Sequence, residues 1–298
     1  MQEESRLTFV NEKAFHLAGI IPLDGQPLDF NLPWHDCFLP IAPNYLLIEN
    51  AIYECAAVGC ETIWIVSHTK MLNLLKTRVG HFVSDPTSHS RVNSPFVESA
   101  RKWIPIYYVE SHPKWYNKRE SLVWSSIYGA RTARDIAKQF SDWVNPDRFY
   151  IKSPYGFYGL TEDFYDKTTC EVRKFASKKK NIYLAGNGGE TFLNKNHLAF
   201  SFGKDQLTHF NMKFYKKSTG RYSSENYKIV LPPKEQWSGR FFGFDDIFDD
   251  INDQQRLDVD SFFPMHSWES YTNSLARMQS LGLKVSRPKN FHIKKDRL

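Results

Sequence analysis

Residues 16–50 join a short apolar run to a helical pattern through a long loop. The run Phe15–Ile21 is mostly apolar, as is typical of a strand buried on both faces of a sheet. Asn44–Gly59 places apolar side chains at three- and four-residue spacing, which predicts a helix with Gly59 at its C-terminal cap. The loop between them contains Pro22, Pro27, Pro33 and Pro40. Because a loop of this size in a compact domain is usually functional, we expect a ligand site beside the first strand.

Apolar runs then alternate with helical patterns along the chain. The predicted strands are Thr62–Val66, Ile104–Val109, Arg148–Lys152 and Asn181–Ala185, and the predicted helices are Lys70–Val79, Leu122–Phe140 and Thr161–Lys178. This alternation indicates βαβ units and therefore an α/β fold with a mainly parallel sheet. Four segments are expected to be adjacent, buried and parallel: Leu17–Ile21, Ile63–Val66, Ile104–Val109 and Phe149–Ile151.

The pattern changes after Ala185. Short strands are predicted at His197–Phe202 and Lys213–Tyr215, and a closing helix at Ser267–Leu281. Between them lie Asp245, Asp246, Asp249 and Asp250, which suit a divalent ion or, more commonly, a solvated acidic turn. No linker interrupts the chain, so we expect one domain over residues 1–298. Its nucleotide-binding half would cover about 14–160, its acceptor-side half about 161–282, and a basic tail 283–298.

Composition limits the class of protein. Of the 298 residues, 41% are hydrophobic and 24% charged, which predicts a globular chain. No run of about 18 apolar residues and no secretory signal occurs, so we expect a cytoplasmic protein without membrane contact. The four cysteines lack CxxC spacing and are expected to be reduced. The net charge of +6 suits a polyanionic partner without requiring one, and the oligomeric state is left open.

Several motifs occur in an order that resembles one superfamily. They are Leu17-Ala18-Gly19, Phe38-Leu39-Pro40-Ile41, Ser121–Ala130, Pro146–Gly156 and Phe262–Tyr271. Over most of the chain this order is similar to that of the nucleotidyltransferase superfamily, including its A-type glycosyltransferases, of the kind found in large tailed bacteriophages. The resemblance implies a Rossmann-like, nucleotidyltransferase-like (GT-A) fold with a central, mainly parallel sheet and a mixed C-terminal acceptor region.

The expected nucleotide site lies at the carboxyl ends of the first strands, where open α/β sheets bind ligands. Gly19 would let the backbone approach a base closely, and Gly19→Val is predicted to weaken nucleotide binding. The full set of candidate nucleotide contacts is Leu17, Ala18, Gly19, Gln26, His68, Trp124 and Ser125. Trp124 could equally belong to the core, and His68 could be an ordinary loop residue. In the loop, His35 is the candidate general base and Asp36 the carboxylate that orients it, although both could simply bond the backbone.

Departures from the superfamily pattern bear on the reaction. The family places Arg and Lys in the first loop, whereas no Arg or Lys lies between His16 and Lys70 here. The family also ends its fourth strand at a metal-binding Asp, whereas Ser153 follows Lys152 here. A pyrophosphorylase needs cations to stabilise the leaving pyrophosphate. We therefore favour a nucleotide-sugar-dependent glycosyltransferase with a UDP-sugar donor. Whether the enzyme uses Mg²⁺ or Mn²⁺ is left open, and no metal ligands are assigned.

Two alternatives remain. The first is a sugar-1-phosphate nucleotidyltransferase, which would make the activated sugar. The second is a catalytically silent nucleotide- or DNA-binding protein.

Two basic segments with interleaved aromatic residues suit contact with nucleic acid. The candidate acceptor contacts are Lys114, Lys118, Arg119, Lys213, Lys216 and Arg221. Given the resemblance, the acceptor would be duplex DNA with hydroxymethylated bases, such as that of a phage. Each segment could instead be a solvated face.

Overall fold

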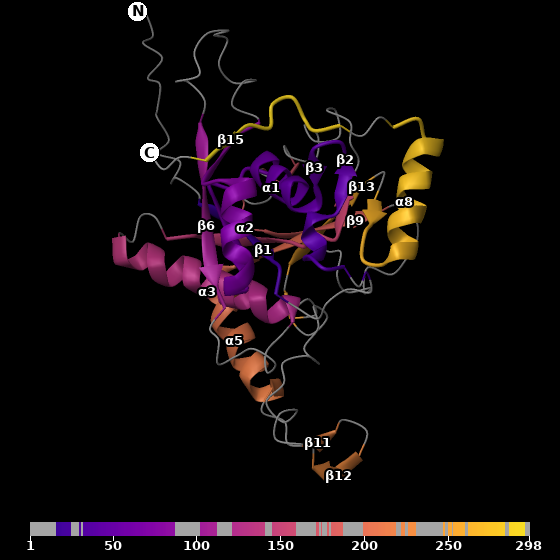
Figure 1. The fold of residues 1–298 in the computed structure, drawn as a ribbon. Coiled ribbons are helices and arrows are strands. Elements are labelled where there is room, and N and C mark those ends of the chain that lie inside the picture. Colours follow the sequence, from indigo (N-terminus) through magenta and orange to yellow (C-terminus); the bar gives the residue numbers. More distant parts are fainter. Residues whose placement is uncertain are drawn as a thin grey trace, which may run out of the picture.

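Among the residues that the computed structural model describes, nine strands form one central sheet (Figure 1). In chain order they are β1 (Leu17–Pro22), β4 (Thr62–Ser67), β5 (Phe82–Ser84), β6 (Trp103–Glu110), β7 (Arg148–Lys152), β9 (Asn181–Gly186), β10 (Ala199–Gly203), β13 (Gln254–Val259) and β15 (Ile293–Lys294). The described residues are 16–24, 30, 32–86, 102–111, 121–140, 145–158, 171, 172, 174, 178, 180–186, 199–218, 222, 223, 226–230, 247, 250, 251, 253–259, 262–283 and 286–295.

The strand order across this sheet is β13-β9-β10-β7-β1-β4-β6-β5-β15. Strands β7, β1, β4 and β6 are parallel to their neighbours: Gly19 of β1 lies opposite Tyr150 of β7 and Ile63 of β4, and Ile63 lies opposite Ile106 of β6. The prediction of four adjacent, parallel strands is confirmed. Their predicted burial holds for β1, β4 and β7 but is wrong for β6, which is only partly buried and exposes Tyr107. Strands β10, β5 and β15 are antiparallel to their neighbours, whereas β13 pairs with β9 in parallel.

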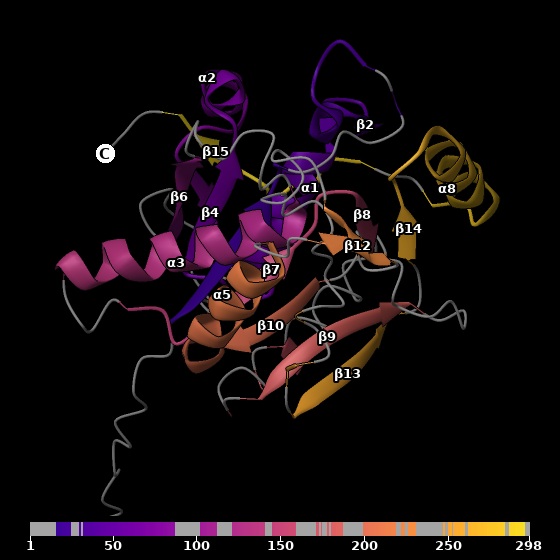
Figure 2. The ribbon, with the colours of Figure 1, turned by 90° about the horizontal axis from the view of Figure 1, so that it is seen from below.

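Helices cover both faces of the sheet. The helices of the described part of the chain are α1 (Leu47–Ala57), α2 (Thr69–Val79), α3 (Leu122–Phe140), α5 (Lys204–Ser218) and α8 (Trp268–Ser280), with a short 3-10 helix η1 (Asp36–Phe38). Three small strand pairs complete the described elements: β2 (Pro40–Ala42) with β3 (Tyr45–Leu46), β8 (Gly156–Tyr158) with β14 (Phe262–Pro264), and β11 (Tyr222–Ser223) with β12 (Asn226–Val230). Figure 2 shows α3 and α5 on one face, with α1 and α2 on the other. No described helix is long and apolar enough to cross a membrane.

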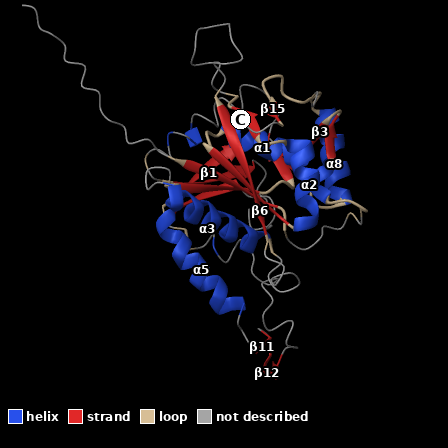
Figure 3. Cartoon of the chain, turned by 60° about the vertical axis from the view of Figure 1, so that its left-hand side comes forward, coloured by secondary structure: helices blue, strands red, loops and turns tan. Residues whose placement is uncertain are grey.

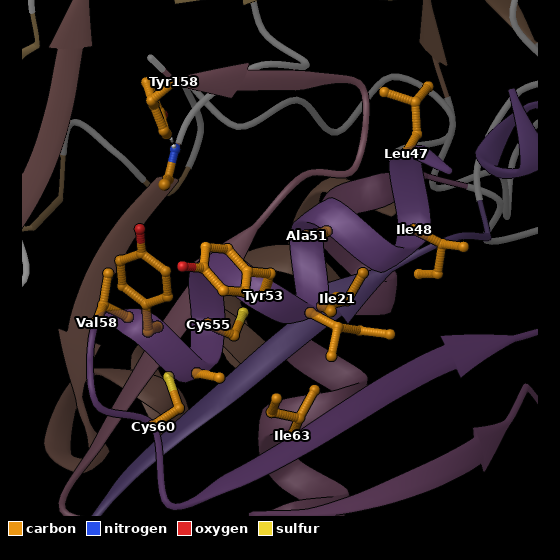
Figure 4. Packing of buried hydrophobic residues seen from close by; sticks show 14 of the residues in the cluster. Ile21, Leu47, Ile48, Ala51, Tyr53, Cys55, Val58, Cys60, Ile63 and Tyr158 are labelled. Atoms are coloured by element: carbon orange, nitrogen blue, oxygen red, sulfur yellow. Dashed lines mark hydrogen bonds between the residues drawn. The ribbon is translucent and has the colours of Figure 1, made fainter. Parts of the chain in front are cut away.

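Helix α1 lies entirely within the core, as Figure 4 shows for Leu47, Ile48, Ala51 and Cys55. Its apolar spacing predicted this helix. The helix ends where Gly59 adopts a positive φ of 94°, a conformation that an L-residue with a side chain rarely takes. The C-cap residue itself is Val58, and Gly59 follows it, so the prediction placed the cap one residue too late. The closing helix was also predicted, and the Ser267 hydroxyl caps α8 by accepting a hydrogen bond from the Ser270 N–H.

The prediction of a strand at Lys213–Tyr215 is wrong, because these residues lie within α5. A segment of three residues is too short to show whether its spacing is that of a strand or of a helix. Over a longer window, however, Leu207, Phe210 and Phe214 recur at helical spacing and are buried. The predicted strand His197–Phe202 corresponds to β10. The predicted helix Thr161–Lys178 lies largely outside the described residues.

The segment 286–295, expected as a basic tail, is bound to the body of the protein. Its strand β15 pairs with β5, and the Phe291 side chain is only 4% exposed and packs edge-on against Tyr45 and Tyr53. Arg287 lies 3.7 Å from the buried carboxylate of Glu49. The positive charge of this segment is therefore partly used within the fold.

Candidate functional site

Polar side chains gather where the parallel strands end. Asp24 follows β1, His68 follows β4, Ser111 follows β6, and Tyr155 lies three residues after β7. The carboxyl ends of parallel strands meet at one edge of the sheet, where open α/β folds bind ligands. Ser125, in the first turn of α3, faces the same edge. We call Asp24, His68, Ser111 and Ser125 the edge cluster.

Asp24 is the centre of the edge cluster. Its carboxylate accepts a hydrogen bond from the Ser111 hydroxyl, and its backbone carbonyl accepts one of 2.7 Å from the Ser125 hydroxyl. Burial raises the pKa of the Asp24 carboxyl above its ordinary value, while the bond from Ser111 and the nearby His68 and His35 oppose that rise. A carboxyl group whose pKa is raised is a candidate acid or base near neutral pH. The sequence had given no reason to select it.

His35 is held by the backbone through both ring nitrogens. Its Nδ1 accepts a hydrogen bond of 3.2 Å from the Cys37 N–H, and its Nε2 lies 3.2 Å from the Leu23 carbonyl, to which it donates in the matching tautomer. Burial lowers the pKa of His35, which favours this neutral form. With neither nitrogen available, the geometry gives His35 the role of capping η1. This is the alternative that the sequence left open.

Three buried residues lie beside the edge cluster: Asp36, Cys37 and Tyr155. Each is at most 8% exposed. Burial raises the pKa of the Tyr155 hydroxyl well above its ordinary value, and the nearby Cys37, Asp36 and Asp24 add to the effect. The same desolvation raises the pKa of the Cys37 thiol. Tyr155 and Cys37 therefore stay protonated at neutral pH, so neither is an activated nucleophile.

A buried ion pair fixes the segment that carries Tyr155. The Lys152 ammonium lies 2.7 Å from the Glu54 carboxylate of α1, and both side chains are at most 3% exposed. Lys152 also donates a 2.6 Å hydrogen bond to the Gly156 carbonyl, and Glu54 accepts one of 3.2 Å from the Tyr158 N–H. Contacts of Lys152 and Glu54 thus hold the turn after β7 at its start, residue 152, and at its end, residues 156–158. The sequence did not reveal this pair, because its members are almost a hundred positions apart.

The structure places the predicted nucleotide contacts in different environments. His68 and Ser125 belong to the edge cluster. Leu17 and Ala18 are fully buried within β1, and Trp124 is 3% exposed and stacks on Phe214 at 4.3 Å between ring centroids. Trp124 is therefore a core residue, which is the second of the two roles that the sequence left open for it. Gln26 lies outside the described residues.

Gly19 lies in the middle of β1, and its open side faces two thiols. A Cβ at this position would lie 3.1 Å from the Cys60 Sγ and 3.2 Å from the Cys55 Sγ. Figure 4 shows both sulfurs beside α1 and the sheet. The space beside Gly19 is thus filled by protein, so its small size serves packing.

We expect Gly19→Val to lower the free energy of unfolding by about 1–3 kcal/mol, because extra methyl groups overpack this contact. Denaturation in urea measures the change. Gly282→Val is a comparison at a site with nothing within 4 Å, although its positive φ of 65° adds strain of its own. A Gly19→Val protein of unchanged stability that failed to bind nucleotide would restore the original prediction.

The predicted acceptor residues are only partly described. Lys213 is paired within the fold: its ammonium lies 2.8 Å from the Asp250 carboxylate, which also lies 3.0 Å from the His209 ring. These partners lower the pKa of Asp250. Lys216 lies on α5. Lys114, Lys118, Arg119 and Arg221 lie outside the described residues.

A divalent metal needs several oxygen or nitrogen ligands in one place. Within the described ranges, no group of three or more His, Cys, Asp or Glu side chains could hold a metal ion. The described residues therefore assign no ligands to the Mg²⁺ or Mn²⁺ that the resemblance left open.

The raised pKa of Asp24 predicts a pH effect on stability. Between the ordinary and the raised pKa, the folded protein binds more protons than the unfolded chain, so stability falls as pH rises through the folded-state pKa. Asp24→Asn keeps an acceptor for Ser111 but cannot ionise. Its stability relative to the parent should therefore increase as the pH rises from the ordinary aspartate pKa of about 4 to the raised value. Urea denaturation across this range would show it, and a constant difference would contradict the expectation.

The chain matches no known family model and no curated protein sequence. Among solved structures, it is similar to an apo UDP-glucose pyrophosphorylase, with a TM-score of 0.52 and 12% identity over 90% of this chain and 100% of that one. It is also similar to a protein from Bacillus anthracis assigned as a glucose-1-phosphate thymidylyltransferase and solved with sucrose, with a TM-score of 0.51 and 10% identity over 92% of this chain and 98% of that one. Identities this low establish the fold alone. The chain has a Rossmann-like, nucleotidyltransferase-like fold, as the motif order predicted.

Proposed function

We propose that this chain is a transferase that binds a nucleotide at the edge cluster, and that it transfers a nucleotidyl group to a sugar 1-phosphate. The observation that carries the proposal is the position of Asp24, a carboxyl group of raised pKa between His68 and Ser111 at the carboxyl edge of the sheet. The fold shared with two sugar-nucleotide enzymes supports this reaction over the glycosyl transfer favoured by the sequence.

Within this proposal the edge cluster has a defined chemical role. Hydroxyl groups of a ribose or sugar would hydrogen-bond to the Asp24 carboxylate, which also accepts from Ser111. The backbone of β1, β4 and β6 holds the cluster rigidly, since Leu23 N–H donates to the Val66 carbonyl at 2.9 Å and Ser111 N–H to the Ser67 carbonyl at 3.2 Å. A preorganised group of this kind orients a substrate at little entropic cost.

Glycosyl transfer from a nucleotide sugar is the second candidate. The absence of Arg and Lys between His16 and Lys70 favours it, because the loop then lacks the cations that a leaving pyrophosphate requires. A UDP-sugar would be the donor. Duplex DNA, including modified phage DNA, stays a prediction as the acceptor, since most of the basic residues proposed for it lie outside the described residues.

One assay separates the two reactions. The protein is incubated with Mg²⁺ or Mn²⁺, each nucleoside triphosphate and a panel of sugar 1-phosphates, and pyrophosphate release is measured. A parallel set contains nucleotide sugars labelled in the sugar, with or without modified duplex DNA. Pyrophosphate release supports nucleotidyl transfer, whereas label in an acceptor selects glycosyl transfer. Activity in neither set would reject both.

The same assay tests the edge cluster. Asp24→Asn should reduce turnover by about a hundredfold, since a misplaced substrate costs on that order. Asp258→Asn is the matched control, because Asp258 is an exposed aspartate of β13 that pairs only with Arg256 among the contacts described. Equal activity in the two variants would remove Asp24 from the site.

A further inference from the structure

An open groove follows the part of β6 that its outer neighbour leaves uncovered. Strand β5 pairs with residues 103–105 of β6, whereas β6 continues to Glu110. The groove has a volume of about 580 Å³. In Figure 3, β6 lies between α2 and α3, and both helices line the groove, with Lys76 from α2 and Ile136 from α3. The groove therefore extends round the edge of the strand, from one face of the sheet to the other.

One wall of the groove is an aromatic stack. The Tyr107 ring stacks on the Trp64 indole, with 4.3 Å between ring centroids and 21° between ring planes. Trp64 is 4% exposed and belongs to the core, whereas Tyr107 is 42% exposed. Because Trp64 covers one face of the Tyr107 ring, the exposed surface of this ring lies on the side of the groove. A ring held in this way is a surface on which a further planar ring can stack.

The other wall of the groove is positively charged. Lys76 and His81 line it. Lys294 and Lys295 of the C-terminal segment lie next to His81, whose N–H donates to the Lys294 carbonyl at 2.9 Å, and a Cβ on Gly80 would lie 3.1 Å from the Lys295 Cα. No carboxylate of the described part of the chain forms an ion pair with any of these three lysines. Their charge is therefore available to an anion from outside the protein.

Charge is distributed unevenly along the groove. Glu110 lies at the end of β6, where its carboxylate accepts a hydrogen bond from the Thr69 hydroxyl. Ile106 lies toward the opposite end, where its N–H donates to the His81 carbonyl at 2.8 Å. A polyanion is therefore repelled at the Glu110 end and attracted at the His81 end, near the lysines of the C-terminal segment.

We propose that this groove binds single-stranded nucleic acid, a partner beyond the transfer reaction proposed above. A base of the bound strand would stack on the exposed face of Tyr107, and phosphates would contact Lys76 and then Lys294 and Lys295. None of these residues is among the acceptor contacts predicted from the sequence. The net charge of +6 adds a long-range attraction for a polyanion.

The combination of the two walls favours a single strand over a duplex. In a duplex the bases are stacked on one another and paired, so none is available to the Tyr107 ring. A single strand presents unstacked bases beside its phosphates, and aromatic side chains bind such bases with little regard to sequence. A groove with an aromatic ring on one side of a strand and ammonium groups on the other can contact both parts of one nucleotide.

Fluorescence anisotropy of the full chain with labelled oligothymidine and oligouridine of about 12 nucleotides tests this proposal. We expect both single strands to bind, more weakly as salt is added, and a DNA duplex of the same length to bind less tightly. Tyr107→Ala should weaken single-strand binding about fivefold to a hundredfold, because it removes the ring on which a base stacks. Tyr107→Phe keeps the ring and should bind within about twofold of the parent. Absence of binding, equal losses in the two variants, or a duplex bound as tightly as the single strands would overturn the proposal.

Removal of positive charge tests the phosphate contacts. The double variant Lys76→Gln with Lys295→Gln should reduce the slope of log K against log salt concentration by about 1.4, since each phosphate contact of a single strand contributes about 0.7. Lys178→Gln with Lys204→Gln is the matched control, because these exposed lysines lie beside β9 and β10, at the other end of the sheet. An unchanged slope in the first pair, or an equal change in both pairs, would reject the proposed contacts.

Photochemical cross-linking locates the bound base without relying on a change in affinity. An oligonucleotide with iodouracil in place of thymine reacts under ultraviolet light with an aromatic ring stacked on it. We expect mass spectrometry to find the cross-link on Tyr107 in the parent, and to find none at this position in Tyr107→Ala. Circular dichroism confirms that each variant is folded. Cross-links confined to other parts of the chain would reject the groove as the binding site.

Discussion

Lys152→Met should lower the free energy of unfolding by about 3–5 kcal/mol, because it leaves the Glu54 carboxylate buried without its counter-charge. Methionine is similar in length to the replaced side chain, so loss of packing contributes little. The remaining partners of Glu54 are the Asn50 amide at 2.9 Å and the Tyr158 N–H at 3.2 Å. These neutral donors cannot replace an ammonium group. Urea denaturation at neutral pH measures the loss.

A double variant separates the charge from the shape of this site. Replacing both members, Glu54→Leu with Lys152→Met, removes the uncompensated charge, and substitution of a buried ion pair by apolar groups is often nearly neutral. We expect the double variant to be more stable than Lys152→Met alone. If the two losses simply added, the pair would not act as a unit.

Phe291→Ala is the second change with a large expected effect. Truncation of a buried phenylalanine costs about 3–5 kcal/mol, from lost burial and the cavity that remains. Phe291 packs against Tyr45 and Tyr53, and the Arg287 guanidinium lies 5.0 Å from its ring centroid. This single substitution therefore removes the packing contacts that hold segment 286–295 against β3 and α1.

Thermal and urea unfolding measure this effect. Leu281→Ala is the control, since Leu281 is 53% exposed and should change stability by less than about 0.5 kcal/mol. A Phe291→Ala protein as stable as the control would mean that the Phe291 ring contributes nothing to the stability of the fold.

The sequence predicted the elements whose signals are local. Four adjacent, parallel strands were inferred from runs such as Ile63–Val66, because a strand buried on both faces is continuously apolar. Their order across the sheet was not inferred. Helix α1 followed from its apolar spacing, and the position of its end, to within one residue, followed from Gly59. The strand predicted at Lys213–Tyr215 failed because three residues are too few to separate a period of two from one of 3.6.

The candidate site could be located but its residues could not. The carboxyl edge of the sheet was predicted from topology. The roles of His35 and Asp24 depend on where the Leu23 carbonyl and Ser111 lie once the sheet has formed, and no local pattern encodes that. The same holds for Gly19, whose small size suits a ligand contact and a tight core equally until Cys55 is seen beside it.

The pairing of β15 with β5 has a consequence for synthesis of the chain. Residues 293 and 294 add to a sheet whose other strands are all made earlier, and Phe291 fills a space in the core beside α1. During translation, that part of the core stays open until residues 286–295 have left the ribosome. Nascent chains stalled before this point would therefore resemble the Phe291→Ala protein: they would have the sheet but expose apolar surface to chaperones and proteases.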